Sequence, residues 1–173
     1  AIFYPTGGGT GLIGMWKAFA ELKALGWLNC KLPKMIAIQS SGCAPIVNAF
    51  NKGLDHAPLW ENANTVASGI RVPAAIGDFL ILDALKESNG YALAVDDEHI
   101  IQIRDLVSKE DGLLLCPEGA ATAAGYQLAI EKKIISPNER VMLFNCATGL
   151  KYPMPPATKS IDKNAPIDFQ QFL

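Results

Sequence analysis

The sequence predicts an α/β fold in which a mostly parallel, twisted sheet is flanked by helices. Two patterns support this prediction. Short apolar runs that end in small residues alternate with longer stretches in which apolar residues recur every three or four positions. This alternation is typical of βαβ units, because parallel strands need a crossover connection that is usually helical.

The predicted elements follow one another along the chain. Strands are expected at residues 2–4, 35–39, 91–95, 113–116 and 141–145, and helices at about 12–25, 45–52, 74–88, 97–107 and 119–133. The first helix should stop at Gly26, since glycine accepts the left-handed backbone that often follows a helix. Pro45 suits the first turn of the second helix, which should end before Gly53.

The later elements have equally local signals. Asn89 and Gly90 should end the third helix, and the acids Asp97 and Glu98 favour the positive N-terminal end of the fourth, which Gly112 closes. The fifth helix is rich in alanine. Residues 55–73 show no clean period, and such a gap between units often carries the loops of a site.

Composition and charge exclude several classes of partner. The chain has 173 residues, half of them hydrophobic, which is enough for one globular domain with a core. A net charge of -2, with both signs spread along the chain, gives no basic face for nucleic acid. No apolar run is long enough to span a membrane and no signal peptide is recognised, so we expect no membrane partner and a cytoplasmic location.

The cysteines are widely spaced along the chain. Cys30, Cys43, Cys116 and Cys146 form no C-x-x-C pair, so their spacing indicates neither a metal site nor a disulfide framework. We expect reduced cysteines, with the last three of them buried.

The glycine run at residues 7–11, which reads Gly-Gly-Gly-Thr-Gly, lies between the first predicted strand and the first predicted helix. Backbone N–H groups at such a place can converge on an anion that the helix dipole already favours. Glycines allow close backbone approach, and Thr10 can add a hydroxyl donor. The run therefore predicts a phosphate site.

A dinucleotide is the alternative guest. Residues 9–14 match the G-x-G-x-x-G pattern of nucleotide-binding folds, which would make the chain a Rossmann-type module. Such sites usually have an acidic residue near the end of the second strand, whereas this strand ends in Gln39 and Ser40. A P-loop is disfavoured, because no Gly-Lys-Ser or Gly-Lys-Thr follows the glycines.

Five segments together resemble a known family. They are Pro5–Phe19, Ile38–Ile46, Ala67–Pro73, Pro117–Thr122 and Asn145–Pro153. In order and spacing they resemble the threonine synthase branch of the tryptophan-synthase-like, fold type II pyridoxal-phosphate enzymes. The resemblance implies that residues 1–155 are the C-terminal half of the large catalytic domain that binds the cofactor, and that residues 156–173 are a proline-rich tail.

The resemblance also implies pyridoxal 5'-phosphate as the cofactor. The residues expected to bind it are Gly7, Gly8, Gly9, Thr10, Gly11, Gly69, Cys146 and Thr148. By this analogy Cys146 faces the ring nitrogen, where a hydroxyl is usual and some related dehydratases have a thiol. Glu118 could order a loop near the ring, but we expect it to cap the fifth helix; Lys151 could meet a substrate phosphate, but we expect a solvated charge.

No lysine of this sequence has the serine- or threonine-flanked context of the family's Schiff-base lysine, so we assign no catalytic residue here and expect that lysine upstream. The parent would be a threonine synthase that converts O-phosphohomoserine and water to threonine and phosphate, while this chain alone would be inactive. Expected partners are an amino-acid substrate, the missing N-terminal part and a second copy in a homodimer. A serine or threonine dehydratase, a nucleotide-binding module and a non-catalytic remnant are the alternatives.

Overall fold

The computed structural model describes residues 1–153 and 159–172. Its strands are β1 (Ile2–Pro5), β2 (Met35–Ser40), β3 (Tyr91–Val95) and β4 (Met142–Leu143). Its α-helices are α1 (Thr10–Ala24), α2 (Pro45–Asn51), α3 (Asp78–Glu87), α4 (Asp97–Asp111) and α5 (Pro117–Glu131). Three short 3-10 helices are η1 (Ser68–Ile70), η2 (Gly149–Lys151) and η3 (Phe169–Phe172).

The described strands form one parallel sheet in the order β3-β2-β1-β4. In this register Phe3 lies opposite Ile36 of β2 on one side and Leu143 of β4 on the other. Every residue of the inner strand β2 is buried, as expected for a parallel sheet covered on both faces. The predicted α/β class is confirmed.

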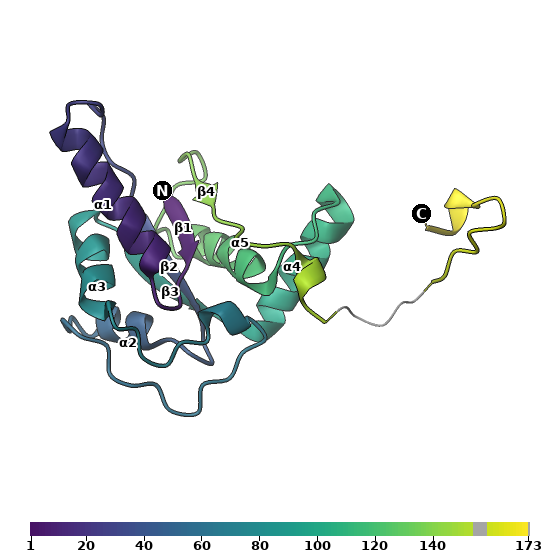
Figure 1. Ribbon diagram of the computed structural model, residues 1–173, viewed down its shortest axis with the longest axis horizontal. Helices are drawn as coiled ribbons and strands as arrows, with labels where there is room; N and C mark the ends of the chain where they lie inside the picture. Colours follow the sequence, from purple (N-terminus) through teal and green to yellow (C-terminus); the bar gives the residue numbers. More distant parts are fainter. Residues whose placement is uncertain (154–158, 173) are drawn as a thin grey trace.

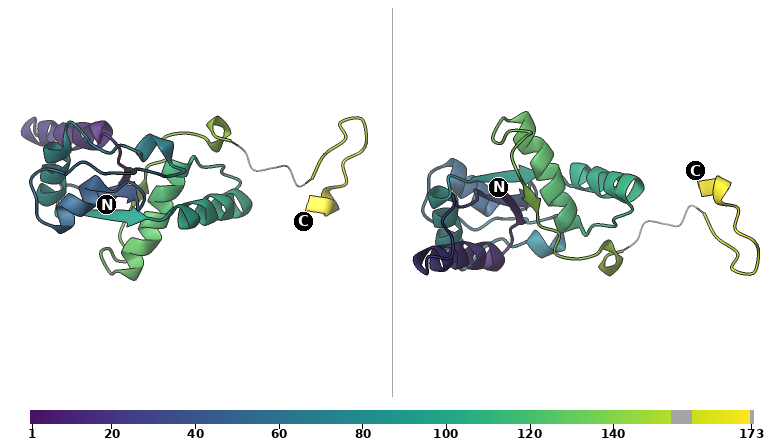
Figure 2. Two further views of the ribbon diagram at one scale, coloured as in Figure 1. Left: turned by 90° about the horizontal axis from the view of Figure 1, so that it is seen from below. Right: turned by 90° about the horizontal axis from the view of Figure 1, so that it is seen from above.

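Helices cover both faces of the sheet (Figures 1 and 2). Because side chains alternate along a strand, Phe3 and Ile36 belong to the core beneath α4 and α5, whereas Ile2 and Met35 belong to the core beneath α1, α2 and α3. Helix α5 crosses β1, β2 and β3, and α4 packs on α5.

The strand order reverses between β1 and β4. The chain leaves β1 into α1 on one face of the sheet, and it reaches β4 from α5 on the other face. Strands β2 and β4 flank β1, so the order reverses there. In open α/β sheets such a reversal is where ligands bind, at the carboxyl ends of the strands. Residues 6–9 and 144–148 meet this edge.

One predicted strand is wrong. Residues 113–116 form a loop with a single antiparallel bridge, between Leu115 and Thr148. The Leu115 N–H donates to the Leu113 carbonyl instead of to a neighbouring strand. Since α4 and α5 pack against each other on one face of the sheet, this link has no need to cross the sheet. Helix α5 consequently starts at Pro117, earlier than expected.

The other helix and strand boundaries differ less from the predicted ones. Helix α3 starts at Asp78 instead of about residue 74, and β4 has two residues where five were expected. Residues 154–155 of the predicted domain and residues 156–158 and 173 of the predicted tail lie outside the described residues. The described tail residues 159–171 are exposed and add no strand to the sheet. Across the described ranges no helix is both long and apolar enough to cross a membrane.

Candidate cofactor site

The glycine loop runs from β1 into α1, and packing beneath it demands glycine. Gly9 is the N-cap of α1 with a left-handed φ of 73°, and a Cβ at this position would overlap the Ile81 side chain. A Cβ on Gly7 would lie 2.7 Å from the Gly69 carbonyl oxygen. Side chains at these positions would therefore push the loop away from α3 and η1.

The glycine loop also offers free backbone N–H groups on a side that is not packed. Within residues 1–153 and 159–172, the N–H groups of Gly7, Gly8 and Gly9 have no hydrogen-bond partner. The first turn of α1 carries no acidic residue, and Gly9 offers no side-chain cap. A Cβ on Gly8 would meet nothing within 4 Å. Free N–H groups at a helix N-terminus fit a phosphate, because they add to the positive end of the helix dipole.

A pocket of about 350 Å³ lies against this loop. Gly8, Thr10 and Ile13 form one wall, and residues 72 and 74–77 form the other. Gly8 and Thr10 thus border a space in which an anion could be held.

The predicted residue Gly69 lies beside the glycine loop. Its carbonyl oxygen forms the close approach to Gly7, and its N–H donates to Glu118 Oε1 at 2.6 Å. A Cβ on Gly69 would lie 2.9 Å from the same carboxylate oxygen. The absence of a side chain therefore lets the η1 loop pass between the glycine loop and α5.

Asp97 anchors the segment before η1, at the end of the η1 loop that lies away from the glycine loop. One carboxylate oxygen accepts the hydroxyls of Ser40, at 3.0 Å, and Thr65, at 2.6 Å. The other oxygen accepts the Val66 N–H at 2.9 Å. Asp97 therefore joins the carboxyl ends of β2 and β3 to the segment that leads to Gly69, a role that its position as a first-turn acid did not reveal.

Glu118 does not cap α5, and that interpretation of the sequence is wrong. Cys116 is the N-cap, with its sulfur accepting the Gly119 N–H at 3.2 Å. Glu118 is the second residue of the helix, and among the described residues no N-terminal amide of α5 donates to its carboxylate. Only 2% exposed, Glu118 instead accepts bonds from Gly69 and from the Tyr152 hydroxyl, the latter at 2.6 Å.

The Tyr152 hydroxyl is held as a donor. Burial, and then the Glu118 carboxylate, raise the pKa of Tyr152. Tyr152 was not singled out from the sequence, since an isolated tyrosine after a strand carries no local signal. Its contact ties η2 to the start of α5.

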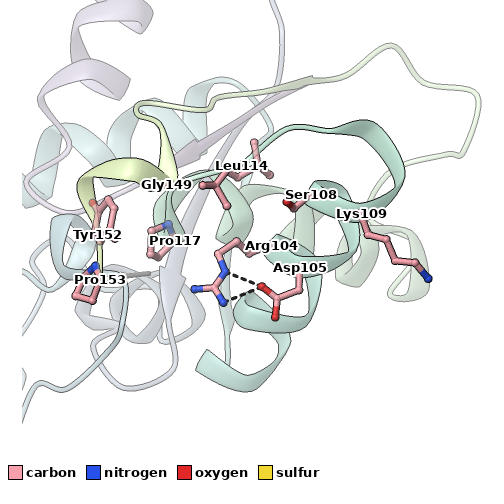
Figure 3. A pocket seen from close by; sticks show the side chains of 10 residues that line it. Arg104, Asp105, Ser108, Lys109, Leu114, Pro117, Gly149, Tyr152 and Pro153 are labelled. Atoms are coloured by element: carbon pink, nitrogen blue, oxygen red, sulfur yellow. Dashed lines mark hydrogen bonds and ion pairs between the residues drawn. The ribbon is translucent and has the colours of Figure 1, made fainter. Parts of the chain in front are cut away.

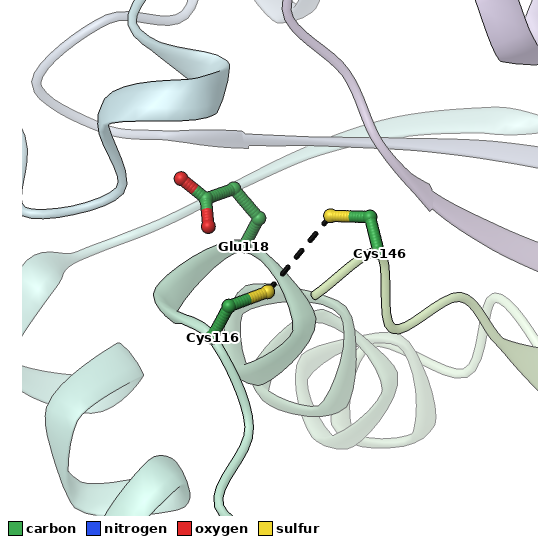
Figure 4. Close-up of side chains that lie close together, drawn as sticks. All are labelled: Cys116, Glu118 and Cys146. Carbon is green, nitrogen blue, oxygen red and sulfur yellow. Dashed lines mark hydrogen bonds between the residues drawn. The ribbon is translucent and has the colours of Figure 1, made fainter. Parts of the chain in front are cut away.

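Cys146 follows β4 and is exposed, contrary to the expectation that it is buried. Its thiol points back toward Cys116, with the two sulfurs 3.8 Å apart (Figure 4). Partial burial of the thiol, and then the nearby Cys116 and Glu118, raise the pKa of Cys146 to about 11. At neutral pH this residue therefore presents a neutral thiol.

Two further residues lie near the carboxyl ends of β1 and β4. The Thr148 side chain accepts the Leu150 N–H at 3.3 Å and so caps η2. Tyr4, which the sequence reasoning missed, places its hydroxyl against Gly11 at the start of α1. Its pKa is raised by burial and then by Cys146. Tyr4, near the end of β1, thus lies between the glycine loop and the segment after β4, where its ring contacts Phe144.

The residue at the end of β2 is not available to bind a ribose. Gln39, which takes the place where nucleotide-binding folds often have an acid, is fully buried. Its Nε2 donates to the Thr6 carbonyl at 3.1 Å, and its Oε1 accepts the Ile46 N–H at 2.9 Å. Gln39 thereby fixes the approach to the glycine loop against the start of α2.

A second pocket, of about 290 Å³, shares no residue with the pocket at the glycine loop (Figure 3). It lies between α4 and η2, with Leu114, Pro117 and Tyr152 among its lining residues. Arg104 there is paired with Asp105 at 2.7 Å. We assign this pocket no part in binding the cofactor.

Comparison with known proteins gives one family. A family model described as "Pyridoxal-phosphate dependent enzyme" matches residues 1–147. The chain is 34% identical to a threonine synthase of Methanocaldococcus jannaschii over 152 residues, which cover 88% of this chain and 37% of that relative. It is 28% identical to a cysteate synthase of Methanosarcina acetivorans, over 86% of this chain and 38% of the relative.

Solved structures agree on the fold. A threonine deaminase from T.th. matches with a TM-score of 0.63 and 20% identity, over 89% of this chain and 51% of that one. The chain thus spans well under half the length of the curated relatives it matches.

Proposed function

The chain belongs to the family of pyridoxal-phosphate-dependent enzymes, and we propose that it is the C-terminal part of the cofactor domain of a threonine synthase. The reaction of that enzyme would convert O-phosphohomoserine and water to threonine and phosphate. Support comes from the threonine synthase similarity along 88% of the chain. The observation that carries the proposal is the set of N–H groups of Gly7, Gly8 and Gly9, which have no partner among the described residues. Gly8 lines a pocket, and the loop follows β1, the strand at which the order of the sheet reverses.

In this proposal the glycine loop binds the phosphate of the cofactor. Gly7, Gly8 and Gly9 donate their N–H groups, and the N-terminus of α1 adds its positive dipole. The hydroxyl of Thr10, which is exposed at the first position of α1, donates a further bond. Gly11 keeps space for Tyr4 beneath the same turn.

Cys146 is the proposed partner of the pyridine nitrogen, and Thr148 lies in the same segment. Pyridoxal phosphate, when bound, supplies an electron sink for breaking bonds beside the amino group of an amino acid. With a pKa of about 11, the Cys146 thiol can donate a hydrogen bond to the nitrogen without transferring its proton. That leaves a weaker sink, which suits elimination and replacement at the β and γ carbons.

Gly69 and Glu118 position the other wall of the site. The carboxylate fixes the backbone of Gly69 at 2.6 Å, and this backbone abuts Gly7. We propose that this arrangement lets the η1 loop approach the cofactor ring without a side chain in the way.

The catalytic lysine and most substrate contacts would lie outside this sequence. Among the described residues, four lysines pair with carboxylates of other segments or of their own helix: Lys17, Lys34, Lys86 and Lys109. Lys151 is exposed on η2. We infer that the chain alone binds the cofactor weakly and turns over no substrate, and that the amino-acid substrate and any homodimer belong to the longer enzyme.

A serine or threonine dehydratase is the second candidate, and the thiol at Cys146 favours it, since some related dehydratases carry a thiol there. An enzyme that includes this chain and its upstream part would be assayed on both substrate types. Phosphate released from O-phosphohomoserine, with threonine formed, supports the first proposal. A keto acid formed from serine or threonine, with no phosphate release, would overturn it in favour of the dehydratase.

A further inference from the structure

Three potential metal ligands converge beside the candidate cofactor site. The sulfurs of Cys116 and Cys146 and a carboxylate oxygen of Glu118 all lie within 4.8 Å of one another (Figure 4). They come from the start of α5 and from the segment after β4. The spacing of these cysteines along the chain indicated no metal site, because the fold, and not the local sequence, brings them together.

The separation of the sulfurs fits a shared metal ion. Two thiolates bound tetrahedrally at about 2.3 Å place their sulfurs about 3.8 Å apart. The Cys116 and Cys146 sulfurs are 3.8 Å apart. A disulfide would require them to close to about 2.05 Å. The observed distance therefore suits metal binding without movement of either sulfur.

The surroundings orient two of the ligands. Cys116 Sγ accepts the Gly119 N–H at 3.2 Å, while Glu118 accepts bonds from Gly69 and Tyr152. Second-shell hydrogen bonds of this kind fix the ligands of metal sites. Glu118 is buried, and none of the ion pairs formed by the described residues includes it. Among the described residues, the buried carboxylate of Glu118 therefore has no cationic partner, and a metal ion would supply one.

We propose that Cys116, Glu118 and Cys146 form a site for one thiophilic divalent cation such as Zn²⁺, with a fourth position open to solvent beside the exposed Cys146. Binding breaks two S–H bonds, forms two metal–sulfur bonds and releases two protons to solvent, so no oxidant is needed. The proposal rests on these three side chains and not on the proposed reaction. Since Cys146 would serve both, metal and cofactor should exclude each other.

Titration of the chain with Co²⁺ tests the site, because cobalt bound by thiolates in a tetrahedron gives a charge-transfer band in the near ultraviolet and bands in the visible. We expect both sets of bands, with their loss on addition of Zn²⁺. Cys146→Ser should weaken Co²⁺ binding by about tenfold or more, and Glu118→Gln should also weaken it. Cys30→Ser, which changes another exposed cysteine, is the matched control and should bind as the original chain does.

Proton release gives a second readout that needs no variant. Binding of Zn²⁺ in weak buffer should release about two protons per metal ion. The absence of a thiolate-to-cobalt band, an unchanged band in Cys146→Ser, or release of no protons would each overturn the proposal. Loss of the band in Cys30→Ser alone would do the same, since it would move the ligands elsewhere.

Discussion

Gly8 and Gly14 separate the binding role of glycine from its structural role. A Cβ at either position would meet nothing within 4 Å, and neither residue has a left-handed φ. Gly8 faces the pocket at the end of the loop, whereas Gly14 lies within α1 and lines no described pocket. Alanine should therefore be tolerated by the fold at both.

We predict that Gly8→Ala weakens binding of pyridoxal phosphate by about tenfold, equal to about 1.4 kcal/mol, because the methyl group enters the space of the phosphate. Gly14→Ala should bind normally and should raise the free energy of unfolding by about 0.5–1 kcal/mol, since alanine is favoured within helices. Equilibrium dialysis and urea denaturation measure the two quantities. Equal cofactor affinity in Gly8→Ala and the original chain would contradict the phosphate assignment.

The ionisation of Cys146 gives a pH prediction. Its pKa rises from the ordinary 9.0 to about 11, first through burial and then through Cys116 and Glu118. The folded chain therefore keeps this proton at pH values where the unfolded chain loses it. The contribution of Cys146 to stability is present below pH 9.0 and is lost as the pH rises toward about 11.

Alkylation of Cys146 should consequently be slow at neutral pH and should accelerate with an apparent pKa of about 11. The Cys30→Ser background leaves Cys146 as the one exposed cysteine, because Cys43 and Cys116 are buried. Glu118→Gln should shift the profile to lower pH by removing a negative neighbour. Alkylation at neutral pH as fast as in the urea-unfolded chain would show that the thiol is not protected as described.

At the level of the elements, two adjacent aspartates have different tasks. Asp96 caps α4 by accepting the His99 N–H at 2.8 Å. Asp97 holds β2 and the loop before η1 through Ser40, Thr65 and Val66. Their sequence context is the same, so only the fold distinguishes them.

Asp97→Ala should therefore increase amide hydrogen exchange in residues 65–72, while α4 stays protected. Asp96→Ala should cost about 1 kcal/mol and increase exchange in the first turn of α4 alone. Hydrogen exchange followed by mass spectrometry resolves the two segments. Increased exchange in residues 65–72 in both variants, or in neither, would argue against the role of Asp97 as the anchor of the η1 loop.

The elements that the sequence predicts well are those with local signals at both ends. Strand β3 matches residues 91–95, and α1, α2 and α4 end before the glycines Gly26, Gly53 and Gly112, all of which have positive φ. The error at residues 113–116 has another origin. An apolar run resembles a strand whether or not a neighbouring strand is available, and pairing is decided by the packing of α4 on α5.

The candidate site likewise combines residues that have a local sequence signal with residues that have none. The glycine loop has a local signature, and the structure brings Gly69 to it as one wall. Tyr4 and Tyr152 could not be assigned from the sequence, and the sequence could not decide between two roles for Glu118, because their contacts join segments that are far apart along the chain. The role of Glu118 in particular depends on Gly69, which lies 49 positions away.

At the scale of the whole molecule, the reversal of strand order explains why these segments meet. Strand β1 leads into the glycine loop and β4 leads to Cys146. The two strands are neighbours, and the helices next to them in the chain lie on opposite faces of the sheet. A cofactor bound by both the glycine loop and the segment with Cys146 would be held at its phosphate and at its ring. The chain, however, spans 37% of the M. jannaschii threonine synthase, and we propose that the Schiff-base lysine belongs to the remainder.

We can compare pyridoxal phosphate with pyridoxal to test directly whether this chain binds the phosphate of the cofactor while the reactive lysine lies elsewhere. Each would be equilibrated with the chain, bound ligand would be measured, and borohydride reduction followed by peptide mapping would locate any lysine adduct. We predict weak binding that depends on the phosphate group, with no adduct at a specific lysine. Equal binding of pyridoxal, or a stable adduct at one lysine of this chain, would contradict it.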